Sequence, residues 1–260
     1  MPLYDLVIPA IVVSFFGLAI GSFLNVVIYR VPKQESIVKV SSHCMSCGHQ
    51  LHWYELIPLF SYLAQGGRCR ACKVKLSPQY PIIEAANMLL YFGVIMIKGW
   101  SLTSILYCGL GSCFIALSVI DFRTYEIPFG INVVIFVLGL VRLAFDLPHW
   151  YNYLIGFFLV SLPMFILVQV VYKLKGVEVF GGGDIKLLAA AGLLVGWKII
   201  LIGFIFGCVI GSVVHIIRMK LSNEDHMLAM GPYLSIGIMI AALWGEQLLS
   251  LYSRLVWGIG

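Results

Sequence analysis

Residues 6–28 read LVIPAIVVSFFGLAIGSFLNVVI and contain no charged side chain. An α-helix rises about 1.5 Å per residue, so a run of this length can cross the hydrocarbon core of a bilayer, which is about 30 Å thick. Hydrophobic residues make up 61% of the 260 residues and charged residues 11%. This composition leaves too little polar surface for a soluble globular protein. The sequence therefore predicts a membrane protein.

Seven further apolar runs follow the first one. They lie at 82–97, 101–120, 129–146, 151–172, 184–197, 198–217 and 229–253. The run at 184–197 is short for a full span, so it must be untilted, re-entrant or in a locally thinned bilayer. We expect an all-α polytopic membrane protein with about eight transmembrane helices.

Positive charges are unevenly distributed over the loops between these runs. If the first helix enters from outside, 13 of the 17 Lys and Arg residues lie on one side, Arg142 lies within a run, and only Lys98, Lys198 and Arg254 lie on the other side. Loops rich in Lys and Arg stay in the cytoplasm. We therefore expect the N-terminus outside and the polar loop 29–81 in the cytoplasm.

The loop 29–81 carries two Cys-x2-Cys motifs, Cys44/Cys47 and Cys69/Cys72, separated by 21 residues. Two such motifs can supply four thiolates to a tetrahedral zinc ion. The alternatives are two disulfides, which a cytoplasmic location disfavours, and a redox pair, which needs only one motif. Four Cys ligands leave no open position for a catalytic water, so we expect a structural zinc that folds this short loop.

Two acidic residues, Asp121 and Asp184, lie at the cytoplasmic ends of separate predicted helices. Two carboxylates brought together share one proton, so that one can activate water and the other can donate a proton, as in aspartic proteases. Alternatively, each residue ends a helix in the headgroup region, and Asp184 caps a helix N-terminus. The glycines at 181–183 favour the first interpretation, because they let a peptide backbone approach.

Two features of the first helix predict its packing. Gly17 and Gly21 form a G-x-x-x-G face, which allows close approach of a neighbouring helix, and Asn25 can hydrogen-bond across that contact. Glu84 opens the second helix, where an acid suits the helix dipole.

Several motifs together resemble the bacterial type IV prepilin peptidases. These are GSFLNVVIYRVP (21–32), the paired Cys motifs, SPQYPIIE (77–84), IDFRTYEIP (120–128), GGGD (181–184) and MGPYLSIG (230–237), and they occur in that order. GGGD also matches the GxGD signature of membrane-embedded aspartic proteases. The sequence departs from the family at Phe129, where Asp is frequent, and at Arg68, where Lys is common.

The resemblance implies two enzymatic activities. The first cleaves the leader of a prepilin or type II secretion pseudopilin after a glycine, with Asp121 and Asp184 as the catalytic pair. The second uses S-adenosylmethionine to methylate the new N-terminal residue, and it involves Gly67 and Arg68. Contact of Glu84 with the pilin amine or the methyl donor is the alternative to its role at the helix start. The expected domains are a first helix (1–28), a zinc-binding loop domain (29–81) and a membrane peptidase domain (82–260).

The expected location is a bacterial inner membrane, with the active site at the cytoplasmic side, and we expect no nucleic-acid partner. Two other functions remain open at this point. One is a membrane protease of the same class without methyltransferase activity. The other is a transporter whose intramembrane acids relay ions.

Overall fold

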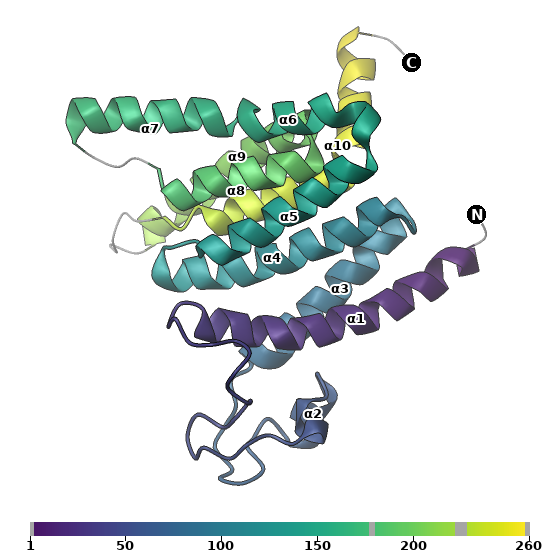
Figure 1. Ribbon diagram of the computed structural model, residues 1–260, viewed down its shortest axis with the longest axis vertical. Coiled ribbons are helices and arrows are strands. Elements are labelled where there is room, and N and C mark those ends of the chain that lie inside the picture. Colours follow the sequence, from purple (N-terminus) through teal and green to yellow (C-terminus); the bar gives the residue numbers. More distant parts are fainter. Residues whose placement is uncertain (1–2, 177–179, 222–227, 258–260) are drawn as a thin grey trace. The chain divides into compact units, whose positions relative to one another are not determined.

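The computed structural model describes residues 3–176, 180–221 and 228–257 (Figure 1). Within these ranges the regular secondary structure consists of helices. The helices are α1 (Leu3–Arg30), η1 (Trp53–Leu56), α2 (Phe60–Ala64), α3 (Gln79–Lys98), α4 (Leu102–Thr124), α5 (Phe129–Phe145), η2 (Leu147–His149), α6 (Trp150–Leu159), α7 (Ser161–Lys175), α8 (Gly182–Val195), α9 (Trp197–Leu221) and α10 (Gly231–Trp257). The predicted all-α fold is confirmed.

Six helical segments are long and apolar enough to cross a membrane. They are Leu6–Arg30, Gln79–Lys98, Leu102–Thr124, Leu147–Lys175, Trp197–Leu221 and Gly231–Leu255. The multi-pass prediction is therefore confirmed. Two further apolar helices are shorter, with 17 residues in α5 and 14 in α8, so the total of eight spans stays a prediction.

The chain forms two compact units, Met1–Ala116 and Leu117–Gly260. In the first unit, α1 packs against α3 through its glycines. A Cβ on Gly21 would lie 2.8 Å from Cα of Glu84, and a Cβ on Gly17 would lie 2.8 Å from Cγ of Tyr91. Close backbone approach at these two positions confirms the predicted packing face. The functional division into three domains stays a prediction.

Polar side chains complete the contact between α1 and α3. Asn87 donates a hydrogen bond of 2.7 Å to the carbonyl of Gly17. Asn25 donates to the carbonyl of Tyr80 at 3.2 Å and accepts a bond from the side chain of Gln79 at 3.3 Å. As predicted, Asn25 bonds to the neighbouring helix, and these bonds define the register in which Glu84 approaches α1.

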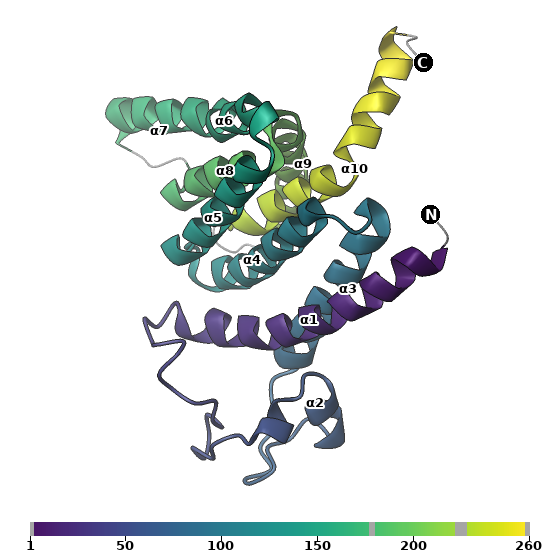
Figure 2. The same cartoon turned by 45° about the vertical axis from the view of Figure 1, so that its right-hand side comes forward.

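In the second unit, the short helix α8 packs against α5, α6, α7 and α9 (Figure 2). Its buried residues are Leu187, Leu188 and all residues from Ala190 to Val195. The backbones of α6 and α8 meet directly at Gly156 and Gly192. Burial on this scale fixes the body of α8 within its unit, and the first turn, which carries Asp184, extends from that buried part.

Candidate active site and metal centre

Asp121 lies in the last turn of α4, and only 4% of it is exposed. The helix ends soon afterwards, because Tyr125 adopts a left-handed backbone conformation with φ of 55°. The backbone N–H of Gly231 donates a hydrogen bond of 2.9 Å to Oδ2 of Asp121. Gly231 is the first residue of α10, where the helix dipole favours negative charge. This hydrogen bond therefore favours the charged form of the Asp121 carboxylate, whereas burial of the side chain opposes it.

Asp184 is the third residue of α8, and the N-cap position of that helix is Gly181. Its Oδ1 atom is buried and has no hydrogen-bond partner within the described ranges. A buried polar atom of this kind is uncommon and calls for an explanation, of which a catalytic role is one. A solvated carboxylate that merely ends a helix would not be expected to have a buried, unpartnered oxygen.

The three glycines before Asp184 differ in their surroundings. A Cβ on Gly181 would lie 3.0 Å from Oδ2 of Asp184, and a Cβ on Gly183 would lie 3.0 Å from Cβ of Ile127. A Cβ on Gly182 would have no atom of the described chain within 4 Å. A Cβ at position 181 would press on the Asp184 carboxylate and one at position 183 would press on Ile127, whereas Gly182 faces open space.

The structure brings Asp121 and Asp184 into one site within the second unit. Their carboxylates are near enough for their negative charges to repel each other. Ile127 packs near both, because it approaches Gly183 and also lies 3.2 Å from the Cβ position of Gly231. The two aspartates therefore lie in the same part of this unit, and a proton shared between them stays a prediction.

The four motif cysteines gather in the first unit, and their sulfur atoms all lie within 4.8 Å of one another. The Sγ atoms of Cys44 and Cys72 are 3.9 Å apart. A tetrahedral zinc ion with Zn–S bonds of about 2.3 Å places its sulfurs about 3.8 Å apart. The donor set and its spacing therefore fit zinc. None of the cysteines in the described ranges forms a disulfide.

The two Cys motifs have the same backbone fold. In the first motif, the N–H of Cys44 donates to the carbonyl of His49, and the N–H of Gly48 donates to the carbonyl of Cys44. In the second motif, the N–H of Cys69 donates to the carbonyl of Val74, and the N–H of Lys73 donates to the carbonyl of Cys69. All four hydrogen bonds are 2.9 Å long. Gly48 and Lys73 occupy equivalent positions with φ of 70° and 59°. In the first motif, the backbone N–H groups of Ser46 and Cys47 lower the pKa of the Cys44 thiol to about 7, which favours the thiolate.

Gly67 and Arg68 directly precede the second motif. Gly67 has φ of 66°, and its N–H donates to the carbonyl of Tyr62 at 2.9 Å. A Cβ on Gly67 would lie 2.9 Å from the Tyr62 hydroxyl oxygen. Arg68 forms an antiparallel bridge with Lys75. These two predicted residues therefore shape the backbone beside Tyr62.

Glu55, in η1, was not singled out from the sequence. Its side chain is 1% exposed, and its Oε2 accepts the N–H of His52 at 3.0 Å and lies 3.3 Å from Nε2 of His49. The backbone N–H of His52, together with the His49 ring, holds the pKa of the Glu55 carboxyl below its usual range. The sequence signal was an acid beside two histidines in the polar loop. The ligand atoms of this group also lie within 4.8 Å of one another.

Comparison with known proteins agrees with this arrangement. Residues 15–98 match the family described as Bacterial Peptidase A24 N-terminal domain, and residues 108–216 match the Type IV leader peptidase family. A protein of Pseudomonas aeruginosa named prepilin leader peptidase/N-methyltransferase is 32% identical, and the alignment covers 91% of this chain and 90% of that protein. The chain belongs to the type IV leader peptidase family.

Other members of the leader peptidase family carry the same name. The Myxococcus xanthus protein is 36% identical over 81% of this chain, and the chain spans 63% of that protein's length. The Aeromonas salmonicida protein is 30% identical over 92% of both chains. No solved structure matches the chain.

The two family matches cover different features of this chain. The cysteine cluster and Glu55 lie in the range 15–98, and both aspartates lie in the range 108–216. Gly231, which binds Asp121, lies outside both ranges. Its contact with the carboxylate therefore comes from the tertiary structure alone.

Proposed function

We propose that the chain cleaves the leader of a prepilin or type II pseudopilin after a glycine and then methylates the new N-terminal residue. The observation that carries the proposal is the approach of buried Asp121 to Asp184 within one unit. The relatives' shared name, prepilin leader peptidase/N-methyltransferase, supports both activities.

In this proposal, Asp121 is the general base of the cleavage. The Gly231 N–H and the N-terminus of α10 stabilise its charged form, whereas Oδ1 of Asp184 lacks a donor in the described part of the chain. Asp121 takes a proton from water as the water oxygen attacks the scissile carbonyl carbon. Protonated Asp184 then delivers its proton to the leaving nitrogen as the C–N bond breaks. The products are the leader carboxylate and a new N-terminal amine.

The methylation is assigned to the first unit. Cys44, Cys47, Cys69 and Cys72 would hold a structural zinc ion that folds a loop with few core residues of its own. S-adenosylmethionine, when bound, would supply the methyl group to the neutral pilin amine. The new N–C bond would replace the C–S bond, whose electron pair stays on sulfur, leaving S-adenosylhomocysteine and an N-methylammonium. Gly67 and Arg68 shape the loop beside the second Cys motif.

We also propose a bacterial inner-membrane location, with the N-terminus outside and both activities at the cytoplasmic side. The charge asymmetry supports this orientation. The pilin's apolar N-terminal helix would lie in the bilayer, and its leader would extend into the cytoplasm. Water reaches the site from that side.

The test uses the purified full-length chain with a prepilin, with and without S-adenosylmethionine. Mass spectrometry of the product N-terminus is expected to show loss of the leader plus one methyl group in place of one hydrogen. Leader loss without methylation would leave only the protease. Absence of both reactions with a folded preparation would refute the proposal and favour a transporter.

Matched variants connect the reaction to the carboxylates. Asp121→Asn and Asp184→Asn are expected to slow leader cleavage about 10²–10⁴-fold, the range for loss of a general acid or base. Glu126→Gln changes an exposed acid five residues from Asp121 and is expected to cleave normally. Full cleavage by either Asn variant would exclude an aspartate mechanism.

A further inference from the structure

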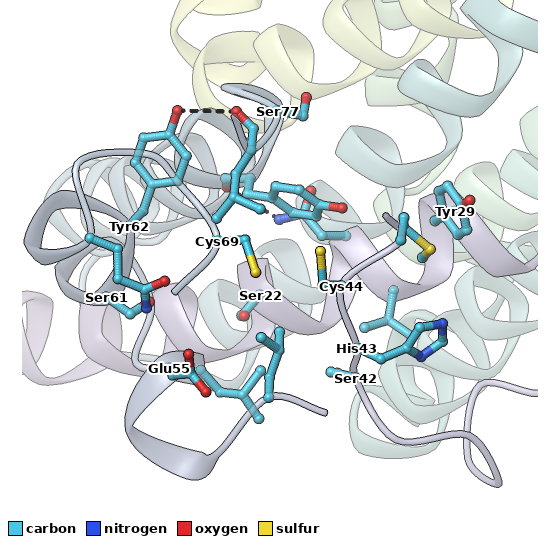
Figure 3. Close-up of a pocket in the computed structure, with 18 of the residues that line it drawn as sticks. Ser22, Tyr29, Ser42, His43, Cys44, Glu55, Ser61, Tyr62, Cys69 and Ser77 are labelled. Carbon is cyan, nitrogen blue, oxygen red and sulfur yellow. Dashed lines mark hydrogen bonds between the residues drawn. The ribbon is translucent and has the colours of Figure 1, made fainter. Parts of the chain in front are cut away.

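The first unit contains a cavity of about 340 Å³ (Figure 3). Its walls come from the second half of α1, both Cys motifs, η1, α2 and the start of α3. Cavities of about 300–1,000 Å³ are typical of small-molecule sites. None of its lining residues belongs to the second unit, so the aspartate pair plays no part in it.

Two buried carboxylates face this cavity, and each has one oxygen held by backbone. Oε2 of Glu84 accepts the N–H of Leu59 at 2.7 Å, and Oε2 of Glu55 accepts the N–H of His52. Oε1 of Glu55 is buried and has no hydrogen-bond partner in the described part of the chain. An anchored carboxylate with a free buried oxygen is suited to receive a donor group from a ligand.

Arg30, a buried cation of the cavity lining, is already bonded to backbone carbonyls. Its guanidinium donates to the carbonyls of Ser36, Val40 and Ser41 at 3.2, 2.7 and 3.3 Å. These bonds hold the loop that leads into the first Cys motif. Lys75 also lines the cavity, but it is exposed at the surface. Among the described buried lining residues, the carboxylates of Glu55 and Glu84 therefore remain to bind a cationic ligand.

Aromatic rings complete the lining, from Tyr29, Tyr62 and Tyr80. Tyrosine faces attract cations and stack on planar bases. Tyr62 is positioned by Gly67, because any Cβ at position 67 would lie 2.9 Å from its hydroxyl oxygen and 3.0 Å from Cζ. The Tyr62 hydroxyl lies 3.5 Å from the carbonyl of Leu76, as the dashed line in Figure 3 marks.

We propose that this cavity binds S-adenosylmethionine, with Glu55 and Glu84 receiving its cationic and hydroxyl groups and Gly67 acting as a positioning residue for Tyr62. The inference rests on the proposed methyltransferase function and locates its donor site. The ligand combines a sulfonium, an ammonium, a carboxylate, ribose hydroxyls and a planar base. The carboxylates and rings of the lining match its cationic groups, hydroxyls and base, and Lys75 of the lining matches its carboxylate. Gly67 does not itself line the cavity among the described residues, so it acts through Tyr62.

A metal ion on His49, His52 and Glu55 is the competing occupant. The three ligand atoms lie close together, but Oε2 of Glu55 already takes the His52 N–H. Of this group only Glu55 lines the cavity, within the described chain. Glu55 is therefore the member of this group, among the described residues, that lies next to both the cavity and the imidazole of His49.

The test measures equilibrium binding of S-adenosylmethionine to the detergent-solubilised full-length chain by calorimetry, without prepilin. Glu55→Gln and Gly67→Ala are each expected to weaken binding by about tenfold or more, a loss equivalent to about 1.4 kcal/mol. Gly66→Ala is the matched control, because Gly66 also has a positive φ of 61° but a Cβ there would meet no described atom within 4 Å. It is expected to bind within about twofold of wild type.

Zinc content distinguishes lost binding from a disrupted loop. Both variants are expected to keep the zinc content of wild type. If Glu55→Gln instead loses a second metal ion and binds S-adenosylmethionine normally, the metal occupant is correct and the proposal is overturned. If wild type methylates pilin but Glu55→Gln and Gly67→Ala bind the donor unchanged, the cavity is wrong and the methyltransferase stands. A wild-type chain that neither binds the donor nor methylates overturns both.

Discussion

The backbone N–H of Gly231 donates a hydrogen bond of 2.9 Å to Oδ2 of Asp121, although 110 positions separate the two residues in the chain. The bond joins the last turn of α4 to the first residue of α10. A Cβ on Gly231 would lie 2.7 Å from that same oxygen. Position 231 therefore supplies the donor and also leaves the space that the carboxylate occupies.

Replacement of Gly231 by alanine is expected to slow leader cleavage by about tenfold or more. The added methyl displaces the Asp121 carboxylate, and loss of a hydrogen bond to a charged group costs about 1.5–3 kcal/mol. The measurement is kcat/KM for a prepilin substrate. Gly130→Ala is the control, because a Cβ there would meet no described atom within 4 Å. Equal rates for the two variants would contradict this role of Gly231.

The substitution Gly182→Ala tests whether the open side of the glycine run admits the substrate. No described atom lies within 4 Å of its Cβ position, so thermal stability is expected to stay within about 0.5 kcal/mol of wild type. If the substrate backbone passes there, cleavage slows while stability is kept. Gly183→Ala provides the contrast, because its Cβ meets Ile127 at 3.0 Å and lowers stability as well. Normal cleavage by Gly182→Ala would show that the substrate takes another path.

The equivalent positions in the two Cys motifs predict opposite effects on zinc retention. Gly48→Ala places a Cβ at φ of 70°, which costs about 1–2 kcal/mol. Lys73→Gly removes a Cβ at φ of 59° and relieves a cost of the same kind, offset in part by the entropy of glycine. Zinc release to a chelator is expected to be faster than wild type for Gly48→Ala and no faster for Lys73→Gly. Faster release from both variants would refute the equivalence of the motifs.

A pH-dependent contribution to stability is expected at the turn between α5 and α6. The hydrogen bond from the Tyr153 hydroxyl, and to a smaller extent that with His149, holds the pKa of the Asp146 carboxyl below its usual range. Nη2 of Arg142 lies 3.9 Å from Oδ2 of Asp146. Because the pKa of Asp146 is lower in the folded state, its carboxylate stabilises the fold at pH values above the unfolded-state pKa of about 3.9. This stabilisation is lost as the pH falls through the folded-state pKa. Asp146→Asn should therefore lower the unfolding midpoint at neutral pH.

The same comparison in acid provides the check on this assignment. The difference in unfolding midpoint between wild type and Asp146→Asn is expected to shrink below the ordinary aspartate pKa of about 3.9. Glu126→Gln removes an exposed acid and is expected to change the midpoint little at any pH. A difference for Asp146→Asn that is the same at both pH values would show that charge is not its cause.

Much of the architecture follows from local properties of the chain. Apolar runs such as 6–28 are helical because a bilayer requires every backbone polar group to be bonded within its segment. The close packing at Gly17 and Gly21 is also readable, since small residues four apart lie on one helix face. The spacing of the cysteines predicted their gathering, because each motif is a short local turn.

The cavity and its acids were much less accessible from the sequence. Glu55 stood beside two histidines in a polar loop, where an acid is ordinarily solvated. Its burial depends on how η1 lies over the Cys motifs and α1, which is a matter of packing between distant segments. For Gly67, the resemblance to the family implied a part in methyl transfer but gave no physical reason for a glycine. The structure supplies one, because Tyr62 lies against the position that a Cβ would occupy.

The sequence by itself determined the helices, the charge asymmetry and the residue types at each candidate site, because these depend on composition and on short spacings. Only the tertiary structure decided that Gly231 holds Asp121, that Asp184 keeps an unpartnered oxygen, and that Glu55 faces a cavity. The physical reason is that hydrogen bonds and burial act over a few ångströms in space. Residues far apart in the chain enter that range only when the helices pack.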